Sequence, residues 1–340
     1  MNHHPGNGAG TASGQNGPAT SPDDRTVLER LDKMQPIEAL IANPDGVLAL
    51  VTGVAGPSYR APGAMMAIWP DAKPVGRLSS GCIEADLAIH AKAALRDGKL
   101  RVLRYGAGSP YRDIVLPCGG GLQVTLFPRP DPSVLRDLSQ VNRRRATATL
   151  HIGRDGALFV TQGSAVTTDS EAAFVYRPEP QFVIFGEGPE TAAFSALVHS
   201  IGYRHITASN GDAAMSGVAR PGETLRHAPD RAFPLREVDE NTAVLFFFHD
   251  HDRELPIIKA ALRTPAFYLG AQGSRRAHAN RVAALTRDGI PAAQIARIHG
   301  PIGLIHSARD PRILAVSVLA EVLARDPNTG PIANPADLSA

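Results

Sequence analysis

The chain has two cysteines, and both lie in glycine-rich segments where a thiol can take part in chemistry. One segment is Gly81-Cys82-Ile83-Glu84, at the predicted start of a helix, and the other is Cys118-Gly119-Gly120-Gly121. A helix N-terminus stabilises a thiolate and lowers its pKa, so Cys82 is the stronger candidate for a metal contact or a sulfur acceptor. The alternative interpretation is an inert thiol, because free cysteines are most often buried core residues.

A loop with anion-binding character follows a predicted buried strand. The segment from Gly56 to Gly63 combines glycine backbone freedom, the hydroxyl groups of Ser58 and Tyr59, and the guanidinium of Arg60. Backbone N–H groups, hydroxyls and a guanidinium are the donors that bind anions. We therefore expect Ser58, Tyr59 and Arg60 to contact an anionic ligand.

A second glycine loop lies in the C-terminal half, between a predicted strand and a predicted helix. Gly186-Glu187-Gly188-Pro189 has the G-x-G spacing that lets a backbone approach a pyrophosphate at a helix N-terminus. Thr191 replaces the third glycine, and Ser209-Asn210 stands where an acidic residue usually holds a ribose. These departures argue against NAD(P) binding, and a Rossmann scaffold that uses no nucleotide is the alternative.

A further anion site is predicted at Gly273-Ser274-Arg275-Arg276, which follows a strand and opens a helix. Ser274 is a good N-cap, whereas arginines in the first turn oppose the helix dipole. Arg275 in that position suggests an anion nearby, phosphate being the natural one. Surface arginines that pack on neighbouring loops are the alternative.

The segment His249-Asp250-His251-Asp252 follows another predicted strand. Residues two apart in an extended chain point the same way, so His249 and His251 are expected to converge on one ligand. A metal would need a third ligand, and the sequence nominates none. Hydrogen bonding to a polar ligand is therefore favoured over a metal site.

The elements that must position these residues differ between the two halves. The first half predicts a mixed α/β unit with a connecting helix and hairpin. Its expected strands are 47–54, 65–69, 100–105 and 122–127, its helices 27–31, 83–95 and 135–141, and its hairpin arms 146–152 and 157–161. The second half alternates strand and helix, which implies a parallel sheet covered on both faces. The strands expected there are 182–185, 203–208, 244–248 and 266–269, and the helices include 191–201 and 311–323.

The predicted fold class is therefore α/β, with an N-terminal mixed α/β domain followed by a C-terminal Rossmann-like parallel-sheet domain. Linker composition sets the expected boundaries. They are a disordered tail at 1–24, the N-terminal domain at 25–130, a connecting helix and hairpin at 131–178, the Rossmann-like domain at 179–326 and a tail at 327–340.

Composition narrows the function classes. The 340 residues include 35 Lys and Arg and 33 Asp and Glu. This balance gives no sign of the basic surface that binds nucleic acid or a membrane surface. We find neither a signal-peptide pattern nor a long apolar run, and two cysteines do not make a disulfide framework. These features predict a cytoplasmic protein.

Taken together, these segments resemble the XdhC/CoxI family of molybdenum hydroxylase accessory proteins. The matching stretches are GPSYRAPGAMM (56–66), GRLSSGCIEADL (76–87), LPCGGGLQV (116–124), VIFGEGPE (183–190), FFHDHDRELPIIKAAL (247–262), AFYLGAQGSRRAHANRVAALTRDGI (266–290) and RIHGPIGLIHSARDPRILAVSVLAE (297–321). They occur in the family's order. The chain departs from the family pattern at Pro57, Ala61, Met65, Ser80 and Phe248, which removes charge and hydroxyl groups from the proposed anion loop.

The resemblance implies an accessory chaperone, in preference to an enzyme, that binds molybdenum cofactor as cargo, either molybdopterin or its nucleotide-bearing form. It implies protection of the cofactor, sulfuration by a cysteine desulfurase and insertion into the apo-enzyme of a molybdenum hydroxylase. The expected contacts are Ser58, Tyr59, Arg60, Gly81, Cys82, Glu84, Cys118, Gly119, Gly120, Gly186, Gly188, Pro189, His249, His251, Ser274 and Arg275. The metal ligand stays open, with Cys82 as the candidate. A homodimer is the default oligomer.

Two enzymatic alternatives remain. One is an NAD(P)-dependent oxidoreductase that uses the Rossmann half, although no Tyr-Lys or His-Asp proton-transfer pair is evident beyond the His249 region. The other is a nucleotidyltransferase acting on the pterin phosphate, for which only Asp250 and Asp252 offer themselves as acidic metal ligands.

Overall fold

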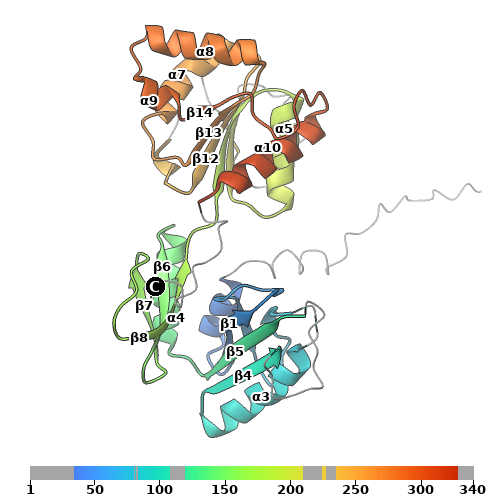
Figure 1. Cartoon of the computed structure of the whole chain (residues 1–340), viewed down its shortest axis with the longest axis vertical. Helices are drawn as coiled ribbons and strands as arrows, with labels where there is room; N and C mark the ends of the chain where they lie inside the picture. The colour runs from blue at the N-terminus through green and yellow to red at the C-terminus, as the bar shows by residue number, and fades with distance from the viewer. Residues whose placement is uncertain are drawn as a thin grey trace, which may run out of the picture.

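The computed structural model describes residues 34–79, 81, 83–107, 119–209, 224–226 and 235–327. Within these residues the chain forms three sheets, of five, three and six strands (Figure 1). The first two belong to the N-terminal half and the third is the parallel sheet of the C-terminal half. The predicted fold class, a mixed α/β unit followed by a Rossmann-like domain, is confirmed.

The five-stranded sheet is antiparallel throughout, in the order β3-β2-β1-β5-β4. Its elements are α2 (Gln35–Ala42), β1 (Val47–Ala55), β2 (Met65–Ile68), β3 (Val75–Gly76), α3 (Glu84–Asp97), β4 (Arg101–Gly106) and β5 (Gly121–Pro128). The unbroken apolar run at the start of β1 is explained by burial on both faces. Leu48 and Leu50 pack with α2, whereas Val47, Ala49 and Val51 pack against α3.

The strand order brings the predicted loops of this half to one edge of the sheet. Ala55 at the end of β1 pairs with Gly121 at the start of β5, and Gly106 at the end of β4 pairs with the same glycine. Strand β2 runs antiparallel to β1, and β3 runs antiparallel to β2, so β3 ends on the same side as β1. The β1–β2 loop, the β3–α3 loop and the β4–β5 connection therefore all leave from the edge where α3 begins.

A smaller sheet follows, in the order β7-β6-β8. Its elements are α4 (Pro132–Arg143), β6 (Ala148–Gly153), β7 (Leu158–Gln162) and β8 (Ser170–Tyr176). The predicted helix and hairpin are confirmed, but the third strand was missed, since it begins with the polar residues Ser170 and Glu171. Phe174 and Tyr176 on β8 share a core with α2 and with Leu48 of β1. The Tyr176 hydroxyl donates to the carbonyl of Gly63 at 2.7 Å, which ties this sheet to the β1–β2 loop.

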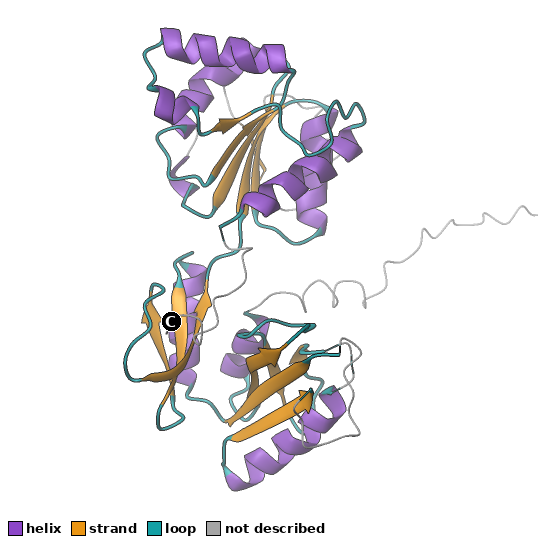
Figure 2. Ribbon diagram, viewed as in Figure 1, coloured by secondary structure: helices purple, strands orange, loops and turns teal. Residues whose placement is uncertain are grey.

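The six-stranded sheet has the order β11-β10-β9-β12-β13-β14, with parallel pairing at each junction. Its elements are β9 (Gln181–Gly186), α5 (Pro189–Ser200), β10 (His205–Ser209), β11 (Thr224–Arg226), η1 (Leu235–Glu237), β12 (Thr242–Phe247), α7 (His251–Ala261), β13 (Tyr268–Ala271), α8 (Arg275–Arg287), α9 (Ala292–Ile295), β14 (Ile298–His299) and α10 (Pro311–Arg325). Helices cover both faces (Figure 2), α5 and α10 on one and α7 and α8 on the other.

The strand order reverses between β9 and β12. From β9 the chain first moves outward to β10 and then returns to β12 on the other side. Open α/β sheets bind ligands outside the carboxyl ends of the strands at such a switch point. Gly186 ends β9 and Phe247 ends β12, so the predicted glycine loop and the His249 segment both lie there.

Several expectations need correction. The predicted helix at 27–31 lies outside the described residues, and α2, β3, β8, β11 and β14 were not predicted. The strand expected at 266–269 occupies Tyr268–Ala271. The extended geometry assumed for His249 and His251 was wrong, because β12 ends at Phe247 and α7 begins at His251. No helix in the described ranges is long and apolar enough to cross a membrane.

Candidate functional site

The first group of predicted site residues meets at the edge of the five-stranded sheet. A Cβ atom at Gly120 would lie 1.9 Å from the carbonyl oxygen of Pro57, and one at Gly121 would lie 2.4 Å from that of Ala107. The Ala107 N–H also donates to the Gly120 carbonyl at 3.1 Å. Since no side chain fits in these gaps, the glycines let the β1–β2 loop and the residues before β5 pack backbone to backbone.

The β1–β2 loop presents a guanidinium to this edge. The Ser58 hydroxyl donates to the carbonyl of Arg60 at 2.8 Å and closes a tight turn, while the Tyr59 ring is exposed. The Nε atom of Arg60 is buried and has no hydrogen-bond partner among the described residues. A buried donor without a partner is costly, so an acceptor on a ligand would stabilise this loop. Ser58, Tyr59 and Arg60 thus share one loop, and their contact with an anion stays a prediction.

The loop before α3 is held by Glu84. Its carboxylate accepts from the Ser79 N–H at 2.9 Å, the Ser79 hydroxyl at 2.5 Å and the Ile83 N–H at 3.3 Å. Burial by itself would raise the pKa of Glu84, but these hydrogen bonds outweigh it and the pKa lies below its ordinary value. The carboxylate predicted to contact a ligand thus bonds to its own loop. Gly81 is open, with no atom within 4 Å of a Cβ placed there.

The two cysteines, Cys82 and Cys118, lie outside the described residues. Their flanking residues still locate the two segments. Ile83 packs in the core beneath α3 with Leu78, and Gly119 immediately precedes the close contact made by Gly120. Both cysteine segments therefore start or end at the same sheet edge as the Arg60 loop.

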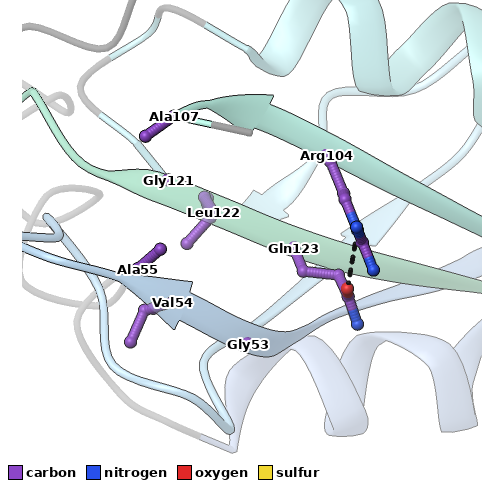
Figure 3. A pocket seen from close by; sticks show the side chains of 8 residues that line it. All are labelled: Gly53, Val54, Ala55, Arg104, Ala107, Gly121, Leu122 and Gln123. Carbon is purple, nitrogen blue, oxygen red and sulfur yellow. Dashed lines mark hydrogen bonds between the residues drawn. The ribbon is translucent and has the colours of Figure 1, made fainter. Parts of the chain in front are cut away.

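A hollow of about 290 Å³ opens beside these loops (Figure 3). It is lined by Gly53, Val54, Ala55, Arg104, Ala107, Gly121, Leu122 and Gln123. Arg104 donates through Nε to the Gln123 side-chain oxygen at 3.1 Å. Neither residue was predicted, although the alternation along β4 carried a signal, because Leu103 and Tyr105 face the core and Arg104 faces away.

The glycine loop of the C-terminal half has the geometry expected of a Rossmann turn. A Cβ at Gly186 would lie 2.6 Å from both the Phe247 carbonyl oxygen and the Thr191 hydroxyl. Gly188 has a φ of 89° and precedes Pro189, the first residue of α5. The first glycine is therefore needed for strand contact and the second for the turn.

Acidic side chains fill the position where a pyrophosphate would approach α5. Glu190 lies in the first turn of the helix, and its carboxylate is 3.4 Å from the His249 ring nitrogen Nε2. The two side chains are close enough to form an ion pair when His249 is protonated. The same Glu190 oxygen has no hydrogen-bond partner among the described residues. Glu187 pairs with Arg253 of α7, also at 3.4 Å. The structure thus brings His249 to the glycine loop through a glutamate that was not among the predicted site residues. The side chain of His251 is not among those described.

The predicted N-cap at Ser274 is confirmed. Its hydroxyl accepts from the Ala277 N–H at 3.1 Å, and Arg275 and Arg276 are exposed, with no ion pair in the described part of the chain. The turn before α8 is anchored by Arg281, which donates to the Gln272 carbonyl at 2.9 Å. The predicted contacts therefore form two groups, one on the antiparallel sheet and one on the parallel sheet. The described residues contain no cluster of three or more metal-ligating side chains.

Comparison with known proteins adds independent findings. The XdhC Rossmann domain model matches residues 182–322, and the XdhC and CoxI family model matches residues 40–106. The chain is 32% identical over 303 residues to the molybdenum cofactor insertion chaperone PaoD of Escherichia coli (strain K12), an alignment that covers 88% of each chain. It is 23% identical over 323 residues to a probable xanthine dehydrogenase component of Bacillus subtilis (strain 168), covering 84% of this chain and 95% of that one.

A solved structure shares the fold. The crystal structure described as a xanthine dehydrogenase from Bacillus halodurans superimposes with a TM-score of 0.70 at 20% identity, covering 91% of this chain and 99% of that chain. The resemblance inferred from the loop motifs is confirmed by the two family models and by the match to PaoD over most of both chains. This chain belongs to the XdhC/CoxI family.

Proposed function

We propose that this chain is a maturation factor that binds molybdenum cofactor as cargo and inserts it into the apo-enzyme of a molybdenum hydroxylase. The observation that carries the proposal is the close backbone contact between Gly120 and the β1–β2 loop, which holds the buried Nε of Arg60 without a partner among the described residues. Backbone N–H groups and a guanidinium suit the phosphate of a pterin cofactor. Similarity to PaoD, whose name describes cofactor insertion, supports the same assignment.

We further propose that the cofactor is sulfurated while it is bound to this chain, and that two partner proteins take part. A chaperone that protects the cofactor during sulfuration would meet a cysteine desulfurase as well as the apo-hydroxylase, in the cytoplasm and as a homodimer. Cys82 is the residue proposed to face molybdenum or to accept sulfur in transit, because in the sequence it stands two residues before Glu84, the first residue of α3, and a helix N-terminus stabilises a thiolate. The cargo is molybdopterin or its dinucleotide form.

The parallel sheet supports cofactor handling better than NAD(P) chemistry. Glu190 places a negative charge at the N-terminus of α5, where a dinucleotide would place its pyrophosphate. Two like charges at one helix end repel, so a dinucleotide would have to displace Glu190 from this position beside His249. Arg275, beside the N-terminus of α8, is the better proposed phosphate contact in this half.

Binding of the cargo can be tested directly. Protein purified anaerobically from cells with an active cofactor pathway is expected to carry about one pterin per chain, measured as the fluorescence of the oxidised pterin after release. The same protein from cells unable to make the cofactor serves as the blank. Protein free of pterin under these conditions would rule out the chaperone function.

The role of the cysteines is tested by activation of a client. Cys82→Ser preserves size but removes the soft thiolate, so it should lower activation of an apo-hydroxylase several-fold more than Cys118→Ser. Alkylation rates of the two thiols at pH 7 give an independent measurement, because a thiolate reacts faster than a thiol. Equal and slow alkylation, with full activation by Cys82→Ser, would leave both cysteines as structural residues.

A further inference from the structure

The hollow beside the loops has a floor of small residues and one polar wall (Figure 3). Gly53 and Ala55 of β1 form the floor, beside Gly121 of β5, whose side-chain position is covered by the carbonyl of Ala107 directly after β4. A floor without bulky side chains exposes flat peptide surface. A planar ring fits such a surface better than a branched or globular group.

The polar wall is organised by hydrogen bonds that fix its direction. Gln123 accepts from Arg104 Nε at 3.1 Å and donates through Nε2 to the Thr52 hydroxyl at 3.2 Å. The Thr52 hydroxyl in turn lies 2.9 Å from the Thr125 hydroxyl, and either of the two can donate this bond. This chain of bonds orients the Arg104 guanidinium at the rim. A guanidinium carries five donors in a planar fork, so it can bond to Gln123 and to a ligand at the same time.

We infer that this hollow binds the pterin ring of the cargo, flat on Gly53 and Ala55, with Arg104 as a further binding residue that donates to the keto edge of the ring. The inference rests on the proposed function and names the part of the cargo held here. A volume of about 290 Å³ is near the lower limit for drug-sized pockets, which suits a fused bicyclic ring and excludes a whole dinucleotide.

The position of the hollow also orients the cargo. Ala55 lines it and is followed by Gly56, the first residue of the Arg60 loop, and a Cβ at Gly56 would lie 3.8 Å from Gly120 Cα. The ring end and the anion loop are therefore continuous along one sheet edge. A pterin seated in the hollow directs its phosphate toward Arg60, whose buried Nε has no partner among the described residues.

Substitution of Gly53 tests the ring site without disturbing the strand. A Cβ there would meet Gln123 Cβ at 3.5 Å, an ordinary contact, so the two methyl groups of Gly53→Val would occupy the hollow. Arg104→Met is the second variant, which removes the donor and leaves the floor intact. Val102→Thr is the matched control, since Val102 is 53% exposed on β4 and does not line the hollow.

The probe is 6-hydroxymethylpterin monophosphate, titrated by its fluorescence. We expect Gly53→Val and Arg104→Met each to raise its Kd at least tenfold and Val102→Thr to leave it unchanged. Arg60→Ala should weaken the phosphate ester but not 6-hydroxymethylpterin itself. Wild-type Kd in both Gly53→Val and Arg104→Met, with normal near-ultraviolet circular dichroism, would overturn the inference. So would tighter binding of GMP than of the pterin probe, because the hollow would then hold a purine.

Failure of this inference is distinguishable from failure of the proposed function. Gly53→Val purified from cofactor-producing cells should retain less than a tenth of the pterin carried by wild type. If wild type and Gly53→Val carry equal pterin, the chaperone function stands and the ring lies elsewhere. If wild type carries none, the proposed function itself fails.

Discussion

At the scale of single residues, Glu84 shows how a polar side chain in a ligand-binding motif can serve its own loop. Three donors from Ser79 and Ile83 surround its carboxylate, and the loop they close carries Gly81 and the Cys82 position. A carboxylate that satisfies backbone N–H groups in this way stabilises the loop in its ionised form. The shape of this loop therefore depends on a carboxylate whose hydrogen bonds stay within the loop.

The lowered pKa of Glu84 predicts a pH-dependent stability. A carboxyl group whose folded pKa lies below its unfolded pKa contributes stability that is present at neutral pH and lost as pH falls through the folded pKa. The free energy of unfolding of wild type should therefore exceed that of Glu84→Gln at pH 7, and this gap should narrow below about pH 4, near the ordinary glutamate pKa. Urea denaturation at pH 7 and pH 3.5 measures both values.

Glu171→Gln provides the matched control, because Glu171 is an exposed glutamate on β8 with no ion pair among the described residues. Its substitution removes one carboxylate without removing a loop contact. A gap between wild type and Glu84→Gln that stays constant with pH would show that the carboxylate does not hold the loop.

At the scale of elements, the rigidity of the α8 site depends on a buried ion pair between two helices. Arg281 of α8 donates to Glu254 of α7 at 2.7 Å, and both side chains are fully buried. The same guanidinium donates to the carbonyl of Gln272, so the pair also positions the turn that carries Ser274 and Arg275. Packing of α7 on α8 and the geometry of a predicted phosphate contact are thus coupled through one residue.

Removal of one partner is expected to be costly. Arg281→Met leaves Glu254 charged and buried, which should lower the free energy of unfolding by about 3–5 kcal/mol. Lys259→Ala is the matched control, since Lys259 pairs with Asp288 between the same two helices at the surface and should cost under about 1 kcal/mol. Chemical denaturation compares the two variants. Equal costs would contradict the importance assigned to burial of the pair.

At the scale of the whole molecule, an ion pair joins the N-terminal half to the parallel sheet. Arg145 follows α4 with a φ of 55°, and its Nε donates to Asp239 at 2.6 Å in the segment that leads into β12. Burial alone would raise the pKa of Asp239, but the hydrogen bond and charge of Arg145 help to keep that pKa below its ordinary value. The two groups of predicted cofactor contacts lie on the two parts that this pair connects.

Loss of this pair should loosen the arrangement of the two halves while leaving each half folded. Arg145→Ala is expected to increase the radius of gyration measured by small-angle X-ray scattering, with unchanged far-ultraviolet circular dichroism. Arg143→Ala is the control, because Arg143 pairs with Glu38 inside the N-terminal half. An unchanged radius in Arg145→Ala would show that other contacts set the arrangement.

Short-range sequence patterns were sufficient to predict most of the helices and strands and to recognise the family. The apolar run at 47–51, the strand and helix alternation after 181 and the Ser274 N-cap are short-range features, and each predicted its element correctly. The strand expected at 266–269 lies two residues later, at Tyr268–Ala271. The segment at 170–176 was missed because it begins with Ser170 and Glu171, and because its partner β6 belongs to an earlier part of the chain.

What the tertiary structure alone decided is which of these pieces meet. Antiparallel pairing of Ala55 and Gly106 with Gly121 brings the β1–β2 loop and the β4–β5 connection to one edge, and no local pattern contains that register. The same pairing places Arg104 beside Gln123 and creates the hollow. Because α7 begins at His251, the segment from His249 to His251 is not the extended chain that was predicted. Residue types and spacing therefore determined the candidate ligand contacts, whereas long-range pairing determined the site, because strand register depends on contacts distant in sequence.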